Sequence, residues 1–517
     1  MSLVHSFKFR RRKPLLLYGF PLFFTLLSLV SATSAAFSEN IFHSNALVQR
    51  AADNSTLKLT DNSPSRLQVS PNTTQNWSFS PDFSVDRLYI TFNTCSQPFQ
   101  NSINGSAANP PSLKLYVSTL SDNSLPGPDS SLAQSAADAV LGFANFTLLN
   151  VGSTVFLGVY APELGSNWQG GWYYEIAASS QAPIHAFSPG QMLFLTDTDS
   201  VSALLTSQNY TNAEPIPYDI YANPLSDNAI LPTLSNSYCA LLTNPSLIKD
   251  ANVERSMTTR GLGHLPKEQF LLSGLNASTE YSLYLSLPNN KNDVNSGGTV
   301  FSPLLFKTKK FDNCQIIYNL DFCSEVAYAV PANPFRYSRD ALKQEYDSYA
   351  SSLFQNFTYS LQIIPCQANG ESLYSLVRNC TDCSTAYKKW LCATTIPMCA
   401  DVTDDDHGLT ARPVNTSRVP QIDSLIQPGA YKEVKPCIGH CWELVQSCPV
   451  QLNFQCPTKY GLDIAYGDME TGCNELGVQP FVLNSANSIF VRWWTVLALI
   501  VILHSIVALS SSVVFPS

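Results

Sequence analysis

The sequence predicts a multidomain chain, with an all-β sandwich-like N-terminal half followed by an α-rich, disulfide-stapled C-terminal segment. Three observations lead to this prediction. Up to about residue 310, short runs of β-branched and aromatic residues alternate with turn-forming Gly, Pro, Asn and Ser. Twelve of the 14 cysteines then lie between Cys314 and Cys473. Both chain ends are apolar in the manner of secretory proteins that are processed at their termini.

The N-terminus has the layout of a secretory signal peptide. Basic residues between Lys8 and Lys13 precede an apolar run from Leu15 to Val30, and small residues follow at 34–36. The run is shorter than the roughly 20 residues that cross a bilayer, which favours cleavage after Ala36 over an uncleaved anchor. We therefore expect residues 1–36 to be a signal peptide.

Sequons for asparagine-linked glycosylation indicate the same route. They are spread along the chain between its two ends, which suggests that all of it faces the lumen. Cysteine density alone would fit a disulfide framework or a metal cluster, but in that oxidising compartment we expect disulfides. The sequons begin at Asn54, Asn72, Asn76, Asn104, Asn145, Asn209, Asn276, Asn356, Asn379 and Asn415.

The C-terminal residues 481–517 are interpreted as a membrane-attachment segment. Small residues at 484–486 precede a spacer and an apolar stretch from Trp493 to Leu509. This order fits attachment of a glycosylphosphatidylinositol (GPI) anchor at Asn484 or Ser485. A single transmembrane helix is the alternative, but no Lys or Arg follows it to hold a cytoplasmic end. Either arrangement keeps the protein on the outer face of the membrane.

Two β-rich domains are expected between these ends, at residues 71–190 and 191–310. Residues 37–70 precede them as a linker, with a short first strand as the alternative. Strands are predicted at 87–93, 112–119, 154–160 and 172–177. The pattern breaks at 183–189, and a second set of strands begins at 192–195. Short strands with turns between them indicate antiparallel sandwiches.

The end of the second β-rich domain resembles the final hairpin of a fibronectin type III domain. A turn at 274–279 leads into SLYLSL, and a second turn at Gly297 leads into VFSPLLFKT. In such domains a tyrosine in the place of Tyr281 closes a corner back onto the preceding turn. Cys95 and Cys239, the two cysteines of this half, would tie the two sandwiches together by pairing.

Beyond Phe311 the pattern becomes helical. Ser338 is a favourable N-cap, and apolar side chains then recur at steps of four and three, which predicts a helix that buries one stripe in the core. A membrane-binding helix is disfavoured because the outer face lacks a band of Lys and Arg. The stripe is Leu342, Tyr346, Tyr349, Leu353 and Phe357.

A second helix is indicated by the spacing of Cys437, Cys441 and Cys448. At about 100° per residue these three fall within roughly 40° of one another, so one face would be stapled to its neighbours. Leu444 and Val445 lie beside that face and are expected to fill the gaps between the bridges.

The cysteine spacing resembles the cysteine-rich domain of Frizzled receptors. The runs C-x8-C-x6-C from Cys383 and PC-x3-C-x6-C from Pro436 occur there with the same intervals, although the one from Cys314 to Cys323 is about one residue longer. Residues 311–480 are therefore expected to be a cysteine-rich Frizzled-like domain. The resemblance implies five pairs and leaves Cys366 and Cys380 for each other. The expected disulfides are Cys314–Cys399, Cys323–Cys392, Cys383–Cys448, Cys437–Cys473, Cys441–Cys456, Cys366–Cys380 and Cys95–Cys239.

Longer motifs resemble the fungal MID family, a stretch-activated Ca²⁺-permeable channel component. They are IIYNLDFCSEVAYAVPANP, NFTYSLQIIPC, CTDCSTAYKKWLCATTIPMC and PCIGHCWELVQSCPVQLNFQCP. The resemblance is detailed over about 310–475 and architectural before it. It implies an accessory subunit that works with a four-repeat, voltage-gated-type calcium channel α-subunit in the plasma membrane, with Ca²⁺ as the transported ion. An extracellular subunit of animal sodium-leak channels is similar in this domain.

Three local signals have a functional and a structural interpretation. Asp401, Asp404, Asp405 and Asp406 could bind Ca²⁺, but they lack the Gly and the bidentate Glu of an EF-hand loop, which favours a solvated loop. Cys380-Thr-Asp-Cys383 could be a redox or zinc motif, but a structural role is favoured inside an oxidised framework. His440 is expected to be a surface or core residue. We expect no resident metal and no cofactor.

The remaining composition excludes other classes of function. A net charge of −9 without a basic cluster beyond the signal peptide argues against nucleic acid. HExxH and GxSxG are absent, which argues against an enzyme. A chain with at most one spanning segment cannot line a pore alone.

We therefore expect a regulatory subunit on the extracellular face of the plasma membrane that promotes Ca²⁺ influx by docking on the α-subunit. The endoplasmic reticulum is the alternative location. The alternative function is a GPI-anchored cell-wall adhesin or mechanosensor without a channel role, and the cell wall is a candidate partner in both cases.

Overall fold

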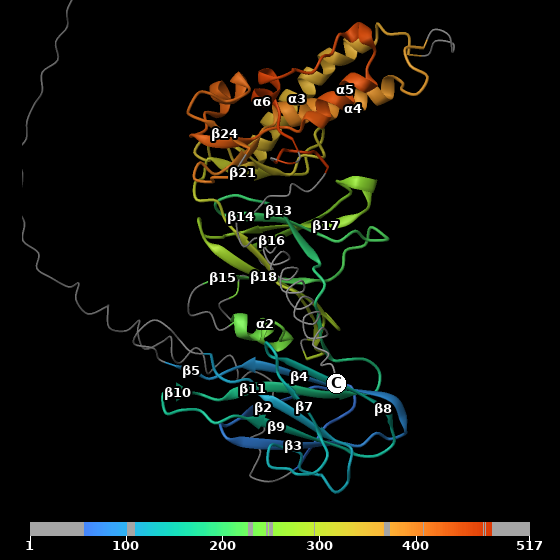
Figure 1. Ribbon diagram of the computed structural model, residues 1–517, viewed down its shortest axis with the longest axis vertical. Coiled ribbons are helices and arrows are strands. Elements are labelled where there is room, and N and C mark those ends of the chain that lie inside the picture. The colour runs from blue at the N-terminus through green and yellow to red at the C-terminus, as the bar shows by residue number, and fades with distance from the viewer. Residues whose placement is uncertain are drawn as a thin grey trace, which may run out of the picture. The chain divides into compact units, whose positions relative to one another are not determined.

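The computed structural model describes residues 56–100, 109–225, 231–244, 247, 252–293, 295–366, 373–406, 408–468, 470 and 472–477 (Figure 1). The expected signal peptide and the C-terminal attachment segment lie outside these residues. All described residues belong to one compact unit, Ala51–Ser517. Within them, none of the helices has the length and apolar character that a membrane span requires.

Residues 57–179, the first β-region, form two facing sheets. One has the order β1-β3-β9-β6-β7 and the other β2-β11-β4-β8, while β5 and β10 pair separately. The strands are β1 (Leu57–Lys58), β2 (Ser65–Val69), β3 (Thr73–Phe79), β4 (Val85–Ser96), β5 (Phe99–Gln100), β6 (Lys114–Ser118), β7 (Ser135–Asp138), β8 (Phe143–Val151), β9 (Val155–Ala161), β10 (Trp168–Gln169) and β11 (Trp172–Ser179).

Buried apolar side chains from alternate positions of both sheets meet in one core, as the inward faces of a sandwich must. Trp172 and Phe92 are among the largest of them. The four strands predicted in this region are confirmed as β4, β6, β9 and β11. The stretch before residue 71, given as a linker or a short strand, contains β1 and β2, and β2 pairs with β11.

Residues 185–307, the second β-region, form another pair of sheets, with orders β12-β19-β18-β15 and β13-β14-β17-β16; β20 also pairs with β18. The elements are β12 (His185–Ser188), β13 (Leu193–Thr198), β14 (Ser202–Ser207), β15 (Asp219–Pro224), η1 (Leu231–Leu234), α2 (Tyr238–Thr243), β16 (Val253–Thr258), η3 (Leu262–His264), β17 (Lys267–Ser273), β18 (Glu280–Pro288), β19 (Gly298–Phe301) and β20 (Leu304–Lys307).

The predicted tyrosine corner is present at the start of β18. The hydroxyl oxygen of Tyr281 accepts a hydrogen bond from Asn276 N at 2.8 Å, and its ring is buried against Phe306. Two features differ from the prediction. The pattern break at 183–189 contains strand β12, which pairs in parallel with β19. The short helix α2 also interrupts the otherwise β-structured half, because Ser237 caps its first turn by accepting from Ala240 N.

Residues 314–477, the cysteine-rich region, combine helices with two small sheets, β21-β22 and β23-β25-β24. The elements are β21 (Cys314–Ile317), β22 (Tyr328–Pro331), α3 (Arg339–Leu361), α4 (Cys380–Thr395), β23 (Met398–Ala400), β24 (Leu409–Arg412), the π-helical turn η5 (Ile422–Ile426), β25 (Tyr431–Val434), α5 (Ile438–Ser447), η6 (Val450–Leu452) and α6 (Tyr460–Ala465).

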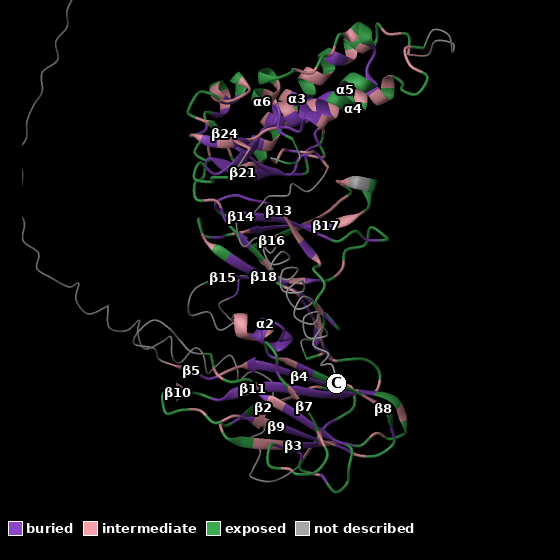
Figure 2. Cartoon of the chain, viewed as in Figure 1, coloured by how far each residue is buried: buried purple, intermediate pink, exposed green. Residues whose placement is uncertain are grey.

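The predicted helix after Phe311 is confirmed as α3. Ser338 is its N-cap, and the Ser338 hydroxyl accepts from Ala341 N at 3.3 Å. Leu342, Tyr346 and Phe357 are buried, while the other two stripe residues are half-buried. The described chain as a whole is mostly β-sheet with few helices, and buried residues follow the strands of both β-regions and the inner faces of α3 and α4 (Figure 2).

Candidate functional site

Seven disulfides organise the described chain, and six of them lie in the cysteine-rich region. They join the cysteines in the same pairs that the resemblance to Frizzled domains and the remaining cysteines imply. The pairs are Cys95–Cys239, Cys314–Cys399, Cys323–Cys392, Cys366–Cys380, Cys383–Cys448, Cys437–Cys473 and Cys441–Cys456.

Helix α5 differs in detail from its prediction. Cys441 lies within the helix, but Cys437 is its N-cap and Cys448 its C-cap, both with extended backbone. Leu444 is buried as expected, whereas the expectation for Val445 is wrong, because 39% of this residue is exposed. At about 100° per residue Val445 falls about 80° from the position of Cys437, at the edge of the stapled face, whereas Leu444 falls about 20° from it.

Helix α4 carries the CxxC motif, and both of its cysteines are oxidised. Cys380 bonds Cys366, and Cys383 bonds Cys448 at the end of α5. Asn379 and Asp382 form a capping box, in which each side chain accepts from the backbone of the other residue. The motif therefore starts α4 and ties it to α5, and it holds no free thiol for redox or zinc chemistry.

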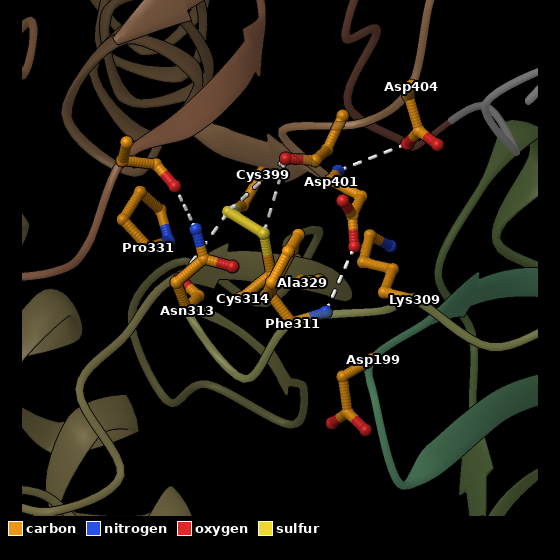
Figure 3. Close-up of a disulfide and its surroundings, with 12 residues drawn as sticks. Asp199, Lys309, Phe311, Asn313, Cys314, Ala329, Pro331, Cys399, Asp401 and Asp404 are labelled. Carbon is orange, nitrogen blue, oxygen red and sulfur yellow. Dashed lines mark hydrogen bonds between the residues drawn. A yellow bond between two sulfur atoms is a disulfide. The ribbon is translucent and has the colours of Figure 1, made fainter. Parts of the chain in front are cut away.

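The four aspartates, weak candidates for Ca²⁺ binding for which the sequence favours a solvated loop, do not form a shared ligand cluster. Asp401 is buried, and its carboxylate accepts from Lys310 N at 2.6 Å and Thr403 N at 2.9 Å. It also accepts from Phe311 N at 3.1 Å (Figure 3). Burial opposes ionisation of Asp401, but these hydrogen bonds outweigh it and lower its pKa.

Asp404, Asp405 and Asp406 are exposed on the loop that follows. Asp404 accepts from Asp401 N at 3.0 Å, and Asp405 lies 3.3 Å from Lys432 Nζ. Asp401 therefore holds the loop before Cys314, next to the Cys314–Cys399 disulfide, and its oxygens are already satisfied by protein donors (Figure 3).

Two buried aspartates of the second β-region bind the backbone of the cysteine-rich region. Asp197 accepts from Ala329 N at 2.8 Å and from Lys309 Nζ at 2.6 Å. Asp199 accepts from Ile316 N at 3.1 Å. We call this contact the aspartate seam. Sequence reasoning missed it, although two acidic residues inside the apolar context of LFLTDTDS were a signal that they pair.

A second buried ion group lies inside the cysteine-rich region. Glu433 on β25 is fully buried, and Arg412 Nη2 and Arg418 Nε each lie 2.5 Å from its carboxylate. Arg418 also donates to the carbonyl of Ala465 at 2.8 Å. The group therefore connects β24, β25 and the end of α6, and it was not predicted from the sequence.

His440 is a core residue, which is one of the two placements expected for it. Its Nε2 accepts from Leu476 N at 3.3 Å, and it lies 3.6 Å from the carboxylate of Glu475. Burial lowers the pKa of His440, because it disfavours the charged ring, although Glu475 acts in the opposite direction.

Among the described residues, one group has metal-type ligands close together: Cys95, Glu175 and Cys239, with ligand atoms within 4.8 Å. The two sulfurs are bonded to each other. Glu175 is buried and contacts Arg66 and the ring of His185. The group therefore fits a structural tie between the two β-regions better than an ion site.

The described sequon asparagines are exposed at Asn72, Asn145, Asn209, Asn276, Asn356, Asn379 and Asn415. Asn76 is half-buried on β3, and its Oδ1 has no partner there. Asn54 and Asn104 lie outside the described residues. The use of each sequon remains a prediction.

Large apolar side chains are exposed around the end of α5. Trp442 and Val445 stand one turn apart, with exposed fractions of 53% and 39%, and Val450 follows at 91%. The hydroxyl of Tyr374 donates to Ser447 O at 3.1 Å and brings the segment before α4 to this place. That segment exposes Leu376 and Val377. We call Trp442, Val445, Val450, Leu376 and Val377 the α5 patch.

The described residues thus define a β-rich protein with a disulfide-bonded, helix-containing C-terminal region that exposes several large apolar side chains. A family profile described as stretch-activated Ca²⁺-permeable channel component, Mid1, matches residues 87–479. This match spans most of the chain, which therefore belongs to that family.

Curated relatives carry corresponding names. Stretch-activated cation channel yam8 of Schizosaccharomyces pombe is 46% identical over 325 residues, which cover 60% of this chain and 66% of that protein. Stretch-activated cation channel MID1 of Saccharomyces cerevisiae is 29% identical over 432 residues, 74% of this chain and 76% of that protein. The protein of the same name in Cryptococcus neoformans is 25% identical over 415 residues. These names support a channel-related role and suggest a location at a membrane.

Proposed function

We propose that the chain is an extracellular accessory subunit of a plasma-membrane stretch-activated calcium channel. Membership of the family over residues 87–479 is the observation on which this proposal rests. The chain would promote Ca²⁺ influx by docking on a four-repeat, voltage-gated-type α-subunit, the partner that the family resemblance implies. The α-subunit, and not this chain, would line the pore.

The α5 patch is the proposed docking surface. Its side chains are apolar, large and exposed on a region whose backbone is held by disulfides, so little order is lost when a partner covers them. Buried aromatic anchors such as Trp442 contribute most of the energy in many interfaces. A rigid surface that binds the open and closed α-subunit unequally would shift the channel's gating equilibrium.

The finer architectural predictions belong to the same proposal. The Frizzled-like fold and the domain limits at 71–190, 191–310 and 311–480 are part of the proposal. An anchor at Asn484 or Ser485, or a C-terminal helix, would hold the chain on the outer face beside the pore. Glycosylated β-regions that engage the cell wall would then transmit tension to the α-subunit.

Affinity purification of the tagged full chain from its own membranes tests the docking. The α-subunit should co-purify with the unaltered chain and be lost from the variant Val450→Asp. Phe83→Asp is the matched control, because Phe83 is an exposed apolar residue of the first β-region, 83% exposed. Stretch-evoked Ca²⁺ uptake should follow co-purification in all three proteins.

Two outcomes would contradict the proposal. Recovery of wall polysaccharide without an α-subunit would favour the alternative of a GPI-anchored adhesin without a channel role. Full co-purification of the α-subunit with each of the two single variants, Val450→Asp and Trp442→Ala, would place the docking surface elsewhere on the chain.

A further inference from the structure

A cavity of about 690 Å³ lies where the second β-region meets the cysteine-rich region. Its walls come from β13 and β14, from the loop between β16 and β17, and from residues 325–328 and 474–477. Small-molecule sites in proteins typically enclose roughly 300–1,000 Å³. The cavity therefore has the size of a ligand site, and both regions contribute to it.

Two cationic side chains line one wall of the cavity. Arg260 donates through Nη1 to Gln269 Oε1 at 2.9 Å, and no other hydrogen bond of its guanidinium is found within the part of the chain that the structure describes. Lys267 is half-buried; burial and the charge of Arg260 lower its pKa, although the carboxylate of Glu325 acts in the opposite direction. No hydrogen bond or ion pair of its ammonium is found among the described residues. Two cations held side by side in this way favour an anion between them.

The acidic residues of the lining are already engaged. Glu325 accepts from Gly261 N at 3.1 Å. Glu475 lies 3.3 Å from Lys389 Nζ, outside the cavity wall. Among the described residues neither carboxylate forms an ion pair with Lys267, and Glu325 acts on Lys267 and Arg260 only through its nearby charge. The remaining lining is rich in hydroxyl and amide groups, which suit a ligand that itself carries hydroxyls.

A separate observation, at Thr196, also indicates a ligand that carries hydroxyl groups. It lies at an irregularity of the β13–β14 register between Leu195 and Asp197, and such bulges re-aim side chains. Thr196 is 3% exposed and lines the cavity, yet its Oγ1 has no partner among the described residues. A buried hydroxyl without a partner is costly, and a ligand would satisfy it.

We propose that this cavity binds a small hydroxylated anion, with one carboxylate or phosphate group on a sugar-sized body. The anionic group would lie between Arg260 and Lys267, and a ligand hydroxyl would pair with Thr196 Oγ1. This inference goes beyond the proposed channel role and does not depend on it. Because the lining belongs to two regions, the bound ligand would also stabilise their packing.

Calorimetric titration of the purified full chain tests the site, with glucuronate and glucose 6-phosphate as the two anionic probes. Glucose and inorganic phosphate are the comparison ligands. The sequon residue Asn209 stands in the lining, so all proteins carry Asn209→Gln to keep a glycan from blocking the site. At least one anionic sugar should bind more tightly than glucose, and it should raise the unfolding temperature.

Three variants locate the binding. Lys267→Gln should weaken the anionic sugars roughly tenfold or more, the effect of losing a charged hydrogen bond. Thr196→Val should weaken the sugar probes and leave inorganic phosphate unchanged. Lys291→Gln, which changes an exposed lysine of the same region outside the cavity, should have no effect.

Equal binding of glucose and both anionic sugars, or no binding of either anion, would overturn the proposal. So would unchanged affinity in both Lys267→Gln and Thr196→Val. If Lys267→Gln does not fold, Thr196→Val and the loss of affinity at high salt decide the question, since ion contacts weaken with ionic strength.

Discussion

Replacing Asp197 with alanine should loosen the contact between the second β-region and the cysteine-rich region. The Asp197 carboxylate accepts from Ala329 N at 2.8 Å, from Lys309 Nζ at 2.6 Å and from Thr198 N at 2.7 Å. Asp197 is 3% exposed, so water does not replace these contacts when the carboxylate is removed. The alanine variant would leave the Lys309 ammonium without its counter-ion, with Thr198 O as its remaining acceptor, and would leave Ala329 N and Thr198 N without the carboxylate that accepts from them.

The expected cost follows from the type of contact. Removing one member of a buried ion pair destabilises proteins by about 3–5 kcal/mol. Asp197→Asn keeps an oxygen for Ala329 N and loses the charge opposite Lys309, so a smaller cost of about 1–3 kcal/mol is expected. The prediction therefore includes an order of stability: Asp197→Ala is the least stable, Asp197→Asn is intermediate and the unaltered chain is the most stable.

Hydrogen exchange at the amides of Ala329 and Ile316 measures the effect where it should occur. Both amides donate across the seam, and the free energy of their opening should fall by the stated amounts. In urea, with a slope of about 1–3 kcal/mol per M, the unfolding midpoint of Asp197→Ala should drop by about 1–5 M. Asp82→Ala, at an exposed aspartate of the first β-region, is the control. The reasoning would be refuted if Asp197→Ala lost less than about 1 kcal/mol of stability and thus behaved like the control Asp82→Ala.

Three further predictions concern other contacts. Replacing Cys95 and Cys239 together with serine should destabilise the chain by about 5 kcal/mol, the chain-entropy value for a sequence separation of 144, as measured by urea unfolding against the intact disulfide. Tyr281→Phe should cost about 1–2 kcal/mol of β18 stability, because Asn276 N loses its buried acceptor, and equal exchange protection of that amide in both proteins would contradict this. Because the folded pKa of His440 is lowered, the unfolded chain binds more protons below about pH 6.5; stability should fall as pH decreases through this value, and the fall should be smaller in His440→Gln.

The elements that the sequence predicts are those whose signal is local. Helix α3 is an example, because its N-cap Ser338 and its apolar stripe lie within one continuous stretch. Strands such as β4 and β11 follow from alternating apolar residues, and the corner at Tyr281 follows from a motif of a few residues. In each case the residues that determine the structure are close neighbours in the chain.

The elements that the sequence does not predict depend on partners far along the chain. Strand β12 is short and polar, and it exists because β19, more than a hundred residues later, pairs with it. Asp197 meets Ala329 at a separation of 132 residues. Pattern reasoning shows that a buried acid needs a donor, but it does not say which of several hundred amides supplies one. The cavity was unpredictable for the same reason.

The cavity and the aspartate seam meet at one place in the chain. Thr196 lines the cavity, and the next residue, Asp197, binds Ala329 N across the seam. Ala327 and Tyr328, which precede Ala329, also line the cavity. A ligand that fixes Thr196 would therefore restrict the two backbone segments that the seam joins, and breaking the seam would enlarge or distort the cavity. Since such coupling is reciprocal, a ligand that stabilises the seam must bind less tightly to Asp197→Ala by the same free energy.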